Sequence, residues 1–467
     1  MTQRPQSPGA QVRARTSATP RQVAFDVLRA VADDDAYANL LLPTRLRRAR
    51  LSGADAAFAT ELTYGTLRRR GHYDLVIAHA AGRAIEAIDA VALDVLRLGA
   101  HQLLGMSTPA HAAVGETVEL TRRARAARTT GFVNAVLRTI ARDDDAVWTQ
   151  RLLEGVTDPD ERAGIAHAHP AWLVHALRAA LEREGRGGEL DDLLVANNAA
   201  PRVTLTALPG LSEAEALGDR TPYSPVGARS AAGDPAGHPL VASGAARVQD
   251  EGSQLAALAL SRARPAQAGE RWLDLCAGPG GKAALLAAEA RAAGAVLTAN
   301  EVVPARAELV RRALRAVDPA VEVRVGDGRA IGDLEPETYD RILLDAPCTG
   351  LGALRRRPEA RWRKTAADVA PLAALQGQLL RSALAALRPG GVLAYVTCSP
   401  HPDETTAIVD ALLAEYSTEV APLDARAVLA GIARTPLDLG GLAHGAAQLW
   451  PHRHGTDAMF IQLLTRR

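Results

Sequence analysis

The sequence has few cysteines and no long apolar run, and each absence excludes a class of protein. Its three cysteines, Cys276, Cys348 and Cys398, form neither a disulfide framework nor the spacing of a zinc site, so we expect free thiols and no metal ion. No stretch approaches the roughly 18 uninterrupted apolar residues of a membrane span, and the first residues lack the apolar core of a signal peptide. We therefore expect a cytoplasmic protein without membrane contacts.

Lysine is almost absent, since the chain has two Lys and 52 Arg with a formal net charge of +1. Basic charge is nevertheless uneven, because residues 1–150 carry 20 Arg against 15 acidic residues, whereas the remainder carries 34 basic and 38 acidic residues. The excess of Arg fits genome composition as well as it fits selection for phosphate contacts. Charge alone therefore does not identify a nucleic-acid-binding protein.

Hydrophobic spacing divides the chain into four parts. Residues 1–19 lack an apolar pattern and are expected to form a disordered tail. Apolar residues recur at helical spacing over 20–145, which predicts an all-α domain. Residues 146–250 combine a helix, an alternating strand and a stretch rich in Pro and Gly, which is typical of a small α+β connecting subdomain. Over 251–467 apolar strands alternate with helices, which predicts a doubly wound, Rossmann-like α/β domain. Its expected strands are 272–275, 296–299, 321–325, 341–344, 392–396 and 459–464.

A glycine loop follows the first strand of the α/β domain and opens a helix. It consists of Cys276, Ala277, Gly278, Pro279, Gly280, Gly281 and Lys282, and we expect the Cys276 side chain to pack in the core. Glycines allow the backbone to approach a ligand closely, and a helix N-terminus favours a carboxylate or a phosphate. The loop also fits the dinucleotide pattern G-x-G-x-x-A, fits a Walker loop less well, and could be a structural turn. It indicates a cofactor without identifying it.

Acidic residues close the next two strands. Glu301 could accept both ribose hydroxyls of a nucleoside, and Asp327 could receive the adenine amino group. Each could instead be an ordinary loop or cap residue. Their joint placement after consecutive strands favours a nucleoside-containing cofactor.

The fourth and fifth strands lead directly into cysteines. The fourth ends in the sequence DAPC, at 345–348, and the fifth in TCS, at 397–399. Because an open α/β sheet binds its ligand beyond the carboxyl ends of its strands, we expect Asp345, Cys348 and Cys398 to meet the glycine loop in one crevice.

DAPC followed by a later TCS resembles the RNA cytosine-5 methyltransferases, and among them the bacterial 16S ribosomal RNA enzymes of the RsmB (Sun/Fmu) family. Residues 20–145 are similar to the RNA-binding antitermination factor NusB through 61–68, 111–114 and 132–138, and 248–254 resembles the start of the family's catalytic domain. The resemblance implies S-adenosylmethionine as cofactor and RNA as partner, namely 16S rRNA or a small-subunit assembly intermediate. We also expect a monomer.

The resemblance assigns a role to each catalytic candidate. Cys398 would attack C6 of a cytosine, because C5 is too poor a nucleophile to take a methyl group unaided. Cys348 would then help remove the C5 proton, Asp345 would bind N3 and the exocyclic amine, and Lys282 would orient Asp345 or the cysteine loop. In DNA cytosine methyltransferases the Pro-Cys cysteine attacks instead, so the residues alone leave the order open. The cofactor-binding set is residues 276–282 with Glu301, Asp327 and Asp345.

A basic segment follows the Cys348 loop, and its members could contact RNA. A target base must be swung out of any helix to expose C6, so the expected substrate is a loop or unstructured segment of RNA. The candidates for phosphate contacts, with Trp362 stacking on a base, are Arg355, Arg356, Arg357, Arg361, Trp362 and Arg363. A charge run is also typical of a solvated face, which is the alternative here.

Several positions depart from the family pattern, and two other classes of protein stay open. The loop has Gly278 where Ala is usual, Glu301 replaces Asp, Thr405 replaces Asn, and 455–460 reads GTDAMF; these changes affect target recognition more than catalysis. A nicotinamide-dependent oxidoreductase would use the same glycine loop but leaves the cysteines unexplained. An RNA-binding assembly factor with a degenerate catalytic domain is the third hypothesis, which the intact cysteine pair disfavours.

Overall fold

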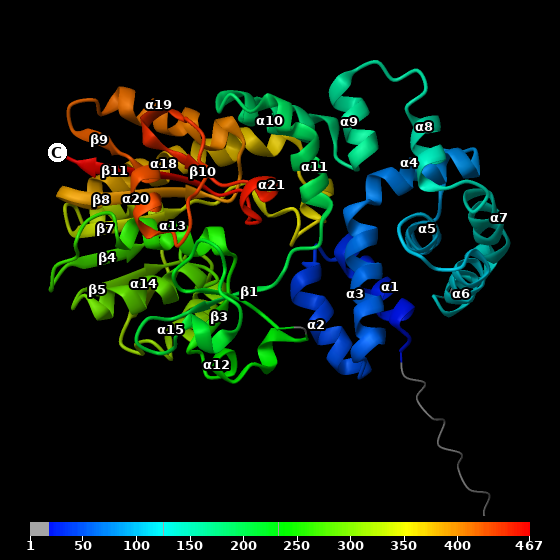
Figure 1. Cartoon of the computed structure of the whole chain (residues 1–467), viewed down its shortest axis with the longest axis horizontal. Helices are drawn as coiled ribbons and strands as arrows, with labels where there is room; N and C mark the ends of the chain where they lie inside the picture. The colour runs from blue at the N-terminus through cyan, green and yellow to red at the C-terminus, as the bar shows by residue number, and fades with distance from the viewer. Residues whose placement is uncertain (1–17, 125, 232) are drawn as a thin grey trace, which may run out of the picture. The chain divides into compact units, whose positions relative to one another are not determined.

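The computed structural model describes residues 18–124, 126–231 and 233–467 (Figure 1). The part of the predicted tail before residue 18 lies outside the described residues. The chain forms two compact units, one of Met1–Thr66 with Ile77–Asp144 and one of Leu67–Val76 with Asp145–Arg467. Each unit is described by itself below.

The first unit is built from helices, as the apolar spacing predicted. Its helices are α1 (Pro20–Asp33), α2 (Ala38–Ala49), α3 (Gly53–Arg68) up to Thr66, α4 (Arg70–Ala81) from Ile77, α5 (Ala90–Leu104), α6 (Ala110–Arg123) and α7 (Thr130–Ile140). The segment Leu67–Val76, which ends α3 and begins α4, belongs to the second unit. Thr19 caps α1 through a hydrogen bond from the Gln22 amide, and Pro20 occupies its first turn. Helix α5 is buried around its whole circumference from Ala92 to Gln102, so the other helices cover it.

The second unit begins with four helices and a small sheet. The helices are α8 (Asp145–Leu152), α9 (Pro159–His167), α10 (Ala171–Arg183) and α11 (Leu190–Asn198). The sheet is antiparallel, with β1 (Thr204–Ala207) between β2 (Gly227–Arg229) and β3 (Ala246–Val248), and α12 (Pro239–Ala242) lies before β3. This region contains more helix than the single helix predicted, because its helices are short and their apolar faces are interrupted by charged residues.

A mixed eight-stranded sheet dominates the second unit, in the order β10-β11-β8-β7-β4-β5-β6, with β9 pairing β11. Strands β4 to β8 run parallel and β11 is antiparallel to β8. The strands are β4 (Arg271–Asp274), β5 (Val296–Asn300), β6 (Glu322–Arg324), β7 (Tyr339–Asp345), β8 (Leu387–Thr397), β9 (Val420–Leu423), β10 (Ala447–Gln448) and β11 (Phe460–Arg466). The predicted Rossmann-like fold is confirmed.

Helices cover both faces of this sheet, which therefore has two cores (Figure 1). Alternate residues of a strand point to opposite faces, so Leu343 of β7 packs in one core and Ile342 and Leu344 pack in the other. The helices of this region are α13 (Glu251–Ser261), α14 (Gly281–Ala292), α15 (Pro304–Leu314), α16 (Ile331–Leu334), α17 (Ala360–Arg363), α18 (Val369–Ala386), α19 (Thr406–Glu415), α20 (Ala425–Ile432) and α21 (Pro451–His454). Burial on both faces fixes the carboxyl ends of the central strands.

The order of the strands reverses between β4 and β7. After β4 the chain adds β5 and β6 on one side, and then returns to add β7 and β8 on the other. In open α/β sheets the crevice beyond such a reversal is where ligands bind. The candidate site therefore lies at the carboxyl ends of β4 and β7.

Candidate active site

The glycine loop packs so tightly that two of its positions exclude any side chain. Gly280 has a φ of +103°, and a Cβ there would lie 2.5 Å from the Cβ of Ala313 in α15. A Cβ on Gly278 would lie 2.1 Å from Oε2 of Glu301. Gly280 is required by its left-handed backbone and its approach to Ala313, whereas at Gly278 the absence of a Cβ leaves room for the Glu301 carboxylate.

Glu301 is buried against this loop at the end of β5. It accepts hydrogen bonds from the Gly278 amide at 3.1 Å and the Val303 amide at 2.9 Å, and Arg306 lies 3.5 Å from it. A carboxylate has about four acceptor positions, so Glu301 retains capacity for the hydroxyls of a ribose. The loop and Glu301 thus fit a nucleoside cofactor.

Asp327 follows β6 at the same edge of the sheet, but its side chain bonds to the turn that follows it. Its side chain is about half exposed, caps the turn at Gly328–Ala330 through the Arg329 amide, and pairs with the Arg329 guanidinium at 2.6 Å. The hydrogen bond from Arg329 lowers the pKa of Asp327. The cap role that the sequence left open is therefore present in the structure.

The two predicted catalytic cysteines meet at the ends of β7 and β8. Sγ of Cys348 and Sγ of Cys398 are 3.5 Å apart, and both residues are half-buried. Nearby, Nζ of Lys282, in the first turn of α14, donates to Oδ2 of Asp345 at 2.8 Å. The structure therefore brings a thiol pair and an ion pair to one edge of the sheet.

Hydrogen bonding makes the two thiols unequal. Either sulfur can donate across this contact, and with the proton on Cys348 the hydrogen bond lowers the pKa of Cys398. The positive charges of Lys282 and Arg357 add to this effect against burial and the Asp345 carboxylate. The same hydrogen bond, together with burial, raises the pKa of Cys348 well above its ordinary value. Cys398 is therefore the better thiolate of the pair.

Burial separates Cys276 from this chemistry. Its side chain packs against the core formed with α18, and burial raises its pKa far above that of a free thiol. Lys282 behaves differently, because burial alone would lower its pKa but the Asp345 carboxylate outweighs it and raises the pKa. A cation therefore persists at the start of α14 beside Asp345.

Asp274 is an acidic residue of the site that the sequence analysis missed. It ends β4, is fully buried, and has a pKa raised to about 8 by burial and then by the Asp345 carboxylate. At neutral pH it is thus mostly a neutral acid next to the Lys282 and Asp345 pair. Its sequence signal was a single Asp within the apolar run Trp272-Leu273-Asp274-Leu275.

The structure contradicts two of the predicted RNA contacts in the basic segment. Arg361 is fully buried, and its guanidinium donates to the backbone carbonyls of Arg68, Ala168 and Asn197 and to Oδ1 of Asn198 at 2.7 Å. Arg355 is also buried and donates to the Gly455 carbonyl at 2.7 Å. Because both guanidinium groups are buried and bonded to protein oxygens, they are not presented to a phosphate at the surface, and the structure argues against their predicted role in RNA binding.

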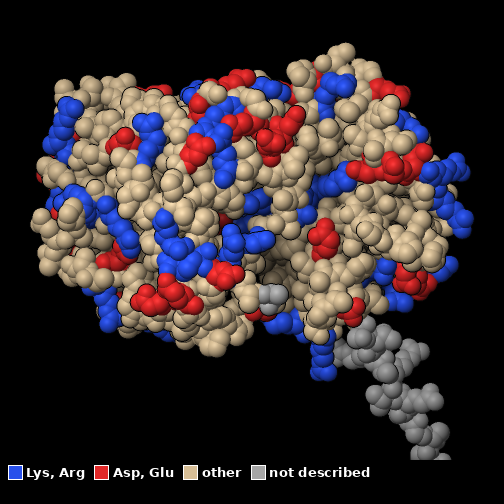
Figure 2. Space-filling model, viewed as in Figure 1, with Lys and Arg blue, Asp and Glu red and all other residues tan. Residues whose placement is uncertain are grey.

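The other members of the segment are partly engaged. Arg356 pairs with the buried carboxylate of Asp457. The indole N–H of Trp362 donates to the Leu67 carbonyl at 2.7 Å, and its ring lies against Gly71, where a Cβ would come within 2.3 Å. Arg357 and Arg363 are half-buried. Both basic and acidic side chains lie on the face shown in Figure 2.

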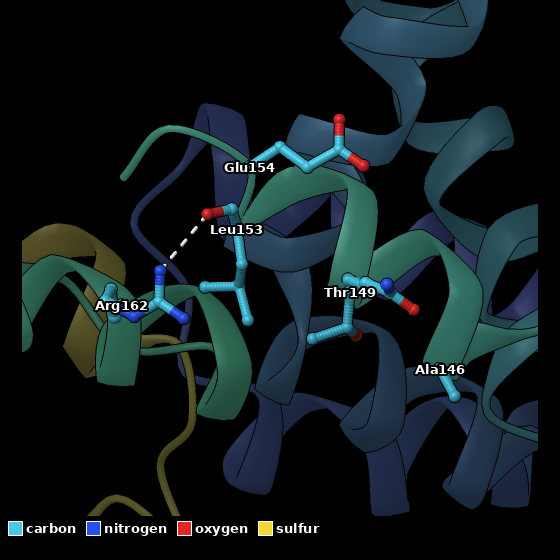
Figure 3. Close-up of a pocket in the computed structure, with 6 residues that line it drawn as sticks. Ala146, Thr149, Leu153, Glu154 and Arg162 are labelled. Atoms are coloured by element: carbon cyan, nitrogen blue, oxygen red, sulfur yellow. Dashed lines mark hydrogen bonds between the residues drawn. The ribbon is translucent and has the colours of Figure 1, made fainter. Parts of the chain in front are cut away.

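A separate pocket lies away from the thiols. It is lined by residues of α8 and α9 and the turn between them, and Arg162 donates to the Leu153 carbonyl at 3.2 Å across it (Figure 3). It contains no thiol. Among the residues that the structure describes, no group of three His, Cys, Asp or Glu side chains is placed to hold a metal ion, and no helix is long and apolar enough to cross a membrane.

Comparisons with known proteins agree with both units. Residues 263–465 match the family model of the 16S rRNA methyltransferase RsmB/F, and residues 18–142 match that of the NusB family. The "Putative methyltransferase Rv1407" of Mycobacterium tuberculosis is 50% identical over 96% of each chain. The ribosomal RNA small subunit methyltransferase B of Pseudomonas syringae pv. tomato is 35% identical over 85% of this chain and 87% of its own.

A solved structure shares the fold along almost the whole chain. The crystal structure of PH0851 superposes with a TM-score of 0.76 at 22% identity, covering 96% of this chain and 98% of that one. A methyltransferase homologue from Pyrococcus horikoshii, 23% identical, gives a TM-score of 0.52 and covers 67% of this chain and all of its own. With the sequence matches, the chain belongs to the RsmB/F family of 16S rRNA methyltransferases and is an S-adenosylmethionine-dependent RNA methyltransferase.

Proposed function

We propose that the enzyme methylates C5 of a cytosine in RNA through a covalent adduct between Cys398 and C6. The observation that supports it is the thiol pair at the strand ends, with Sγ atoms 3.5 Å apart and the lower pKa on Cys398. Attack of the Cys398 thiolate forms the S–C6 bond and moves the electrons of the C5–C6 double bond toward C5. This turns C5 into a nucleophile.

Asp345 and Lys282 stabilise the charge that develops on the base. Asp345, held by Lys282 at 2.8 Å, would accept from the exocyclic amine through one oxygen and, as a protonated carboxylic acid when the base binds, donate to N3 through the other. The Lys282 cation would offset the negative charge that the attack places on the ring. S-adenosylmethionine supplies the methyl group. Cys348 then helps to remove the C5 proton, which passes to a water molecule that the Cys348 thiol orients; the electrons of the C5–H bond reform the C5–C6 double bond, and the Cys398 thiolate leaves.

The cofactor would lie along the glycine loop between β4 and β5. Backbone groups of 276–281 would face it, Glu301 would bind the ribose hydroxyls, and Asp327, with Asp345 alongside, would complete the pocket. Asp327 would have to exchange its contact with Arg329 for the adenine amino group. The exposed position of that pair makes the exchange inexpensive.

The RNA substrate is expected to be 16S rRNA or a small-subunit assembly intermediate. This rests on the family description and on the relatives named ribosomal RNA small subunit methyltransferase B. We assign RNA binding to the NusB-like part, predicted as 20–145, and catalysis to 251–467, with 146–250 as the connecting subdomain. That the protein is a monomer in the cytoplasm stays a prediction.

The test combines product analysis with the two single-cysteine variants. The enzyme is incubated with S-adenosylmethionine labelled in its methyl group and 16S rRNA lacking 5-methylcytosine, and the digested RNA should contain labelled 5-methylcytidine. Cys398→Ala should abolish transfer, whereas Cys348→Ala should accumulate a covalent RNA complex. Label on another base would refute the cytosine assignment, and a complex trapped only by Cys398→Ala would exchange the roles of the two thiols.

A further inference from the structure

A buried carboxylate, Glu404, connects the two loops that carry the thiols. Glu404 ends the turn Pro402–Glu404 that follows β8 and is fully buried. Its Oε1 accepts from the Thr349 amide at 2.8 Å, and its Oε2 accepts from the Ser399 hydroxyl at 2.6 Å and from the Thr349 hydroxyl. The residues that directly follow Cys348 and Cys398 therefore bind the same side chain.

A second set of hydrogen bonds braces Glu404 from α18 and β8. Gln376 donates to Oε1 of Glu404 at 3.1 Å and to the Pro347 carbonyl at 2.8 Å. The Tyr395 hydroxyl donates to the Glu404 carbonyl at 2.7 Å and lies 3.2 Å from Oε1 of Gln376. The Cys348 loop is thus held on both sides of the thiol, at Pro347 and at Thr349.

An ionised carboxylate suits this position. The groups that surround its oxygens are donors, namely one amide N–H, one side-chain amide and two hydroxyls, and hydrogen bonds to an ionised acceptor are stronger than those between neutral groups. A glutamine of the same shape would place an N–H group against these donors. The surrounding donors therefore require a negatively charged side chain at position 404, and not only one of this size.

We propose that Glu404 is a positioning residue that fixes the two thiols relative to each other and keeps the proton on Cys348, so that Cys398 carries the thiolate. This rests on the proposed roles of the two cysteines. The hydrogen bond to Cys398, burial and the charge of Cys398 raise the pKa of Cys348, and the negative charge of Glu404 raises it further. Asp345 also faces both thiols, Tyr395 faces Cys348, and Lys282 and Arg357 face Cys398.

The experiment reads the thiols directly, without RNA or cofactor. The full chain is alkylated with iodoacetamide between pH 5 and 10, and mass spectrometry of peptides gives separate rates for Cys348 and Cys398. In the wild type Cys398 should react at lower pH than Cys348. In Glu404→Gln the two profiles should converge, with the ratio of their rates at pH 7 falling about tenfold, which corresponds to a change of one pKa unit.

Turnover supplies a second measurement. Glu404→Gln should lower kcat for methyl transfer with little change in KM for RNA, because the carboxylate is buried and its hydrogen bonds go to Thr349, Gln376 and Ser399. Glu404→Asp should recover part of kcat, since it keeps the charge. Ser399→Ala, which removes one donor to Oε2, should shift the alkylation ratio in the same direction by a smaller factor.

Glu270→Gln is the matched control. Glu270 is another buried carboxylate, which accepts from Arg341 and from the Trp272 indole at 2.7 Å before β4, at the opposite end of that strand from the thiols. Its variant should lose stability without changing the alkylation ratio. If Glu404→Gln and Ser399→Ala lose stability in the same way and leave the ratio unchanged, Glu404 is a structural residue and the inference is overturned.

The same experiment separates this inference from the proposed function. If wild-type protein transfers no methyl group to cytosine but the alkylation ratio still falls in Glu404→Gln, the methylation proposal is wrong and the positioning role stands. Equal reactivity of the two wild-type thiols would overturn the positioning role itself. Should Glu404→Gln fail to fold, Ser399→Ala decides the question by the same ratio.

Discussion

The thiol edge is formed by the loops after β7 and β8, and the arginine segment, residues 355–361, lies between these loops in the chain. The two regions use their polar groups differently. At the thiol edge, Cys348 and Cys398 end half-buried beside the ion pair of Lys282 and Asp345. In the arginine segment, the terminal nitrogens of the Arg361 guanidinium donate hydrogen bonds to four oxygens of the protein. Position at a strand end, and not density of charge, distinguishes reactive from structural groups here.

Removing the cation of the thiol edge should have the largest effect. Lys282→Met keeps the length of the side chain but leaves Asp345 without its partner and the developing charge on the base without compensation. We expect kcat for methyl transfer to fall about 1000-fold, with little change in thermal stability, because such electrostatic contacts act chiefly in the transition state. The chain offers a natural control in its other lysine, Lys364, in the basic region. Lys364→Met should retain kcat. If kcat fell equally in both variants, the catalytic role would not be specific to the thiol edge.

Removing a cation from the arginine segment should instead cost stability. Arg361→Met leaves buried carbonyls, including those of Ala168 and Asn197, without donors, and we expect a loss of about 3 kcal/mol in the free energy of unfolding. Urea unfolding measures it, and methyl transfer per folded molecule should persist. Arg315→Met, at an exposed position after α15, serves as the control with no expected loss. A selective loss of RNA affinity in Arg361→Met would restore the RNA-binding role that burial contradicts.

Gly352 lies in the chain between the Cys348 loop and the arginine segment, so its substitution should change both the stability of the protein and the reactivity of Cys398. Its amide donates to the Cys398 carbonyl at 2.8 Å, and a Cβ would lie 2.1 Å from the Ala458 carbonyl oxygen. Gly352→Ala must displace backbone, so we expect a loss of about 2 kcal/mol in stability together with slower alkylation of Cys398. Gly115→Ala, in open space on α6, should be neutral or stabilising. Unchanged Cys398 reactivity in Gly352→Ala would show that the thiol does not depend on this contact.

The sequence predicted those features whose signal lies within a short stretch of the chain. Helical and alternating apolar spacing identified the all-α and α/β parts, and strand-end motifs brought Asp345, Cys348 and Cys398 together because parallel strands deliver their carboxyl ends to one edge. The burial of Arg361 could not be foreseen, since its partners lie about 160 to 290 residues earlier in the chain. Glu404 was missed for the same reason, because its partners Thr349 and Gln376 come from separate elements.

The smallest predicted effect concerns a carboxyl group behind the arginine segment. Asp250 is fully buried, and burial followed by the neighbouring Asp457 raises its pKa to about 6. Because the folded state holds this proton more tightly than the unfolded chain, the contribution of Asp250 to stability is present below pH 4 and is lost as pH rises through 6. Asp250→Asn keeps the acceptor for the Gly252 and Asp457 amides and removes the titration. We expect the free energy of unfolding of the variant to exceed that of the wild type by about 1 kcal/mol at pH 7.5, and this difference should disappear near pH 4.5. Urea midpoints at the two pH values measure it, and a difference that does not change with pH would show that Asp250 is ionised in the folded protein throughout this range.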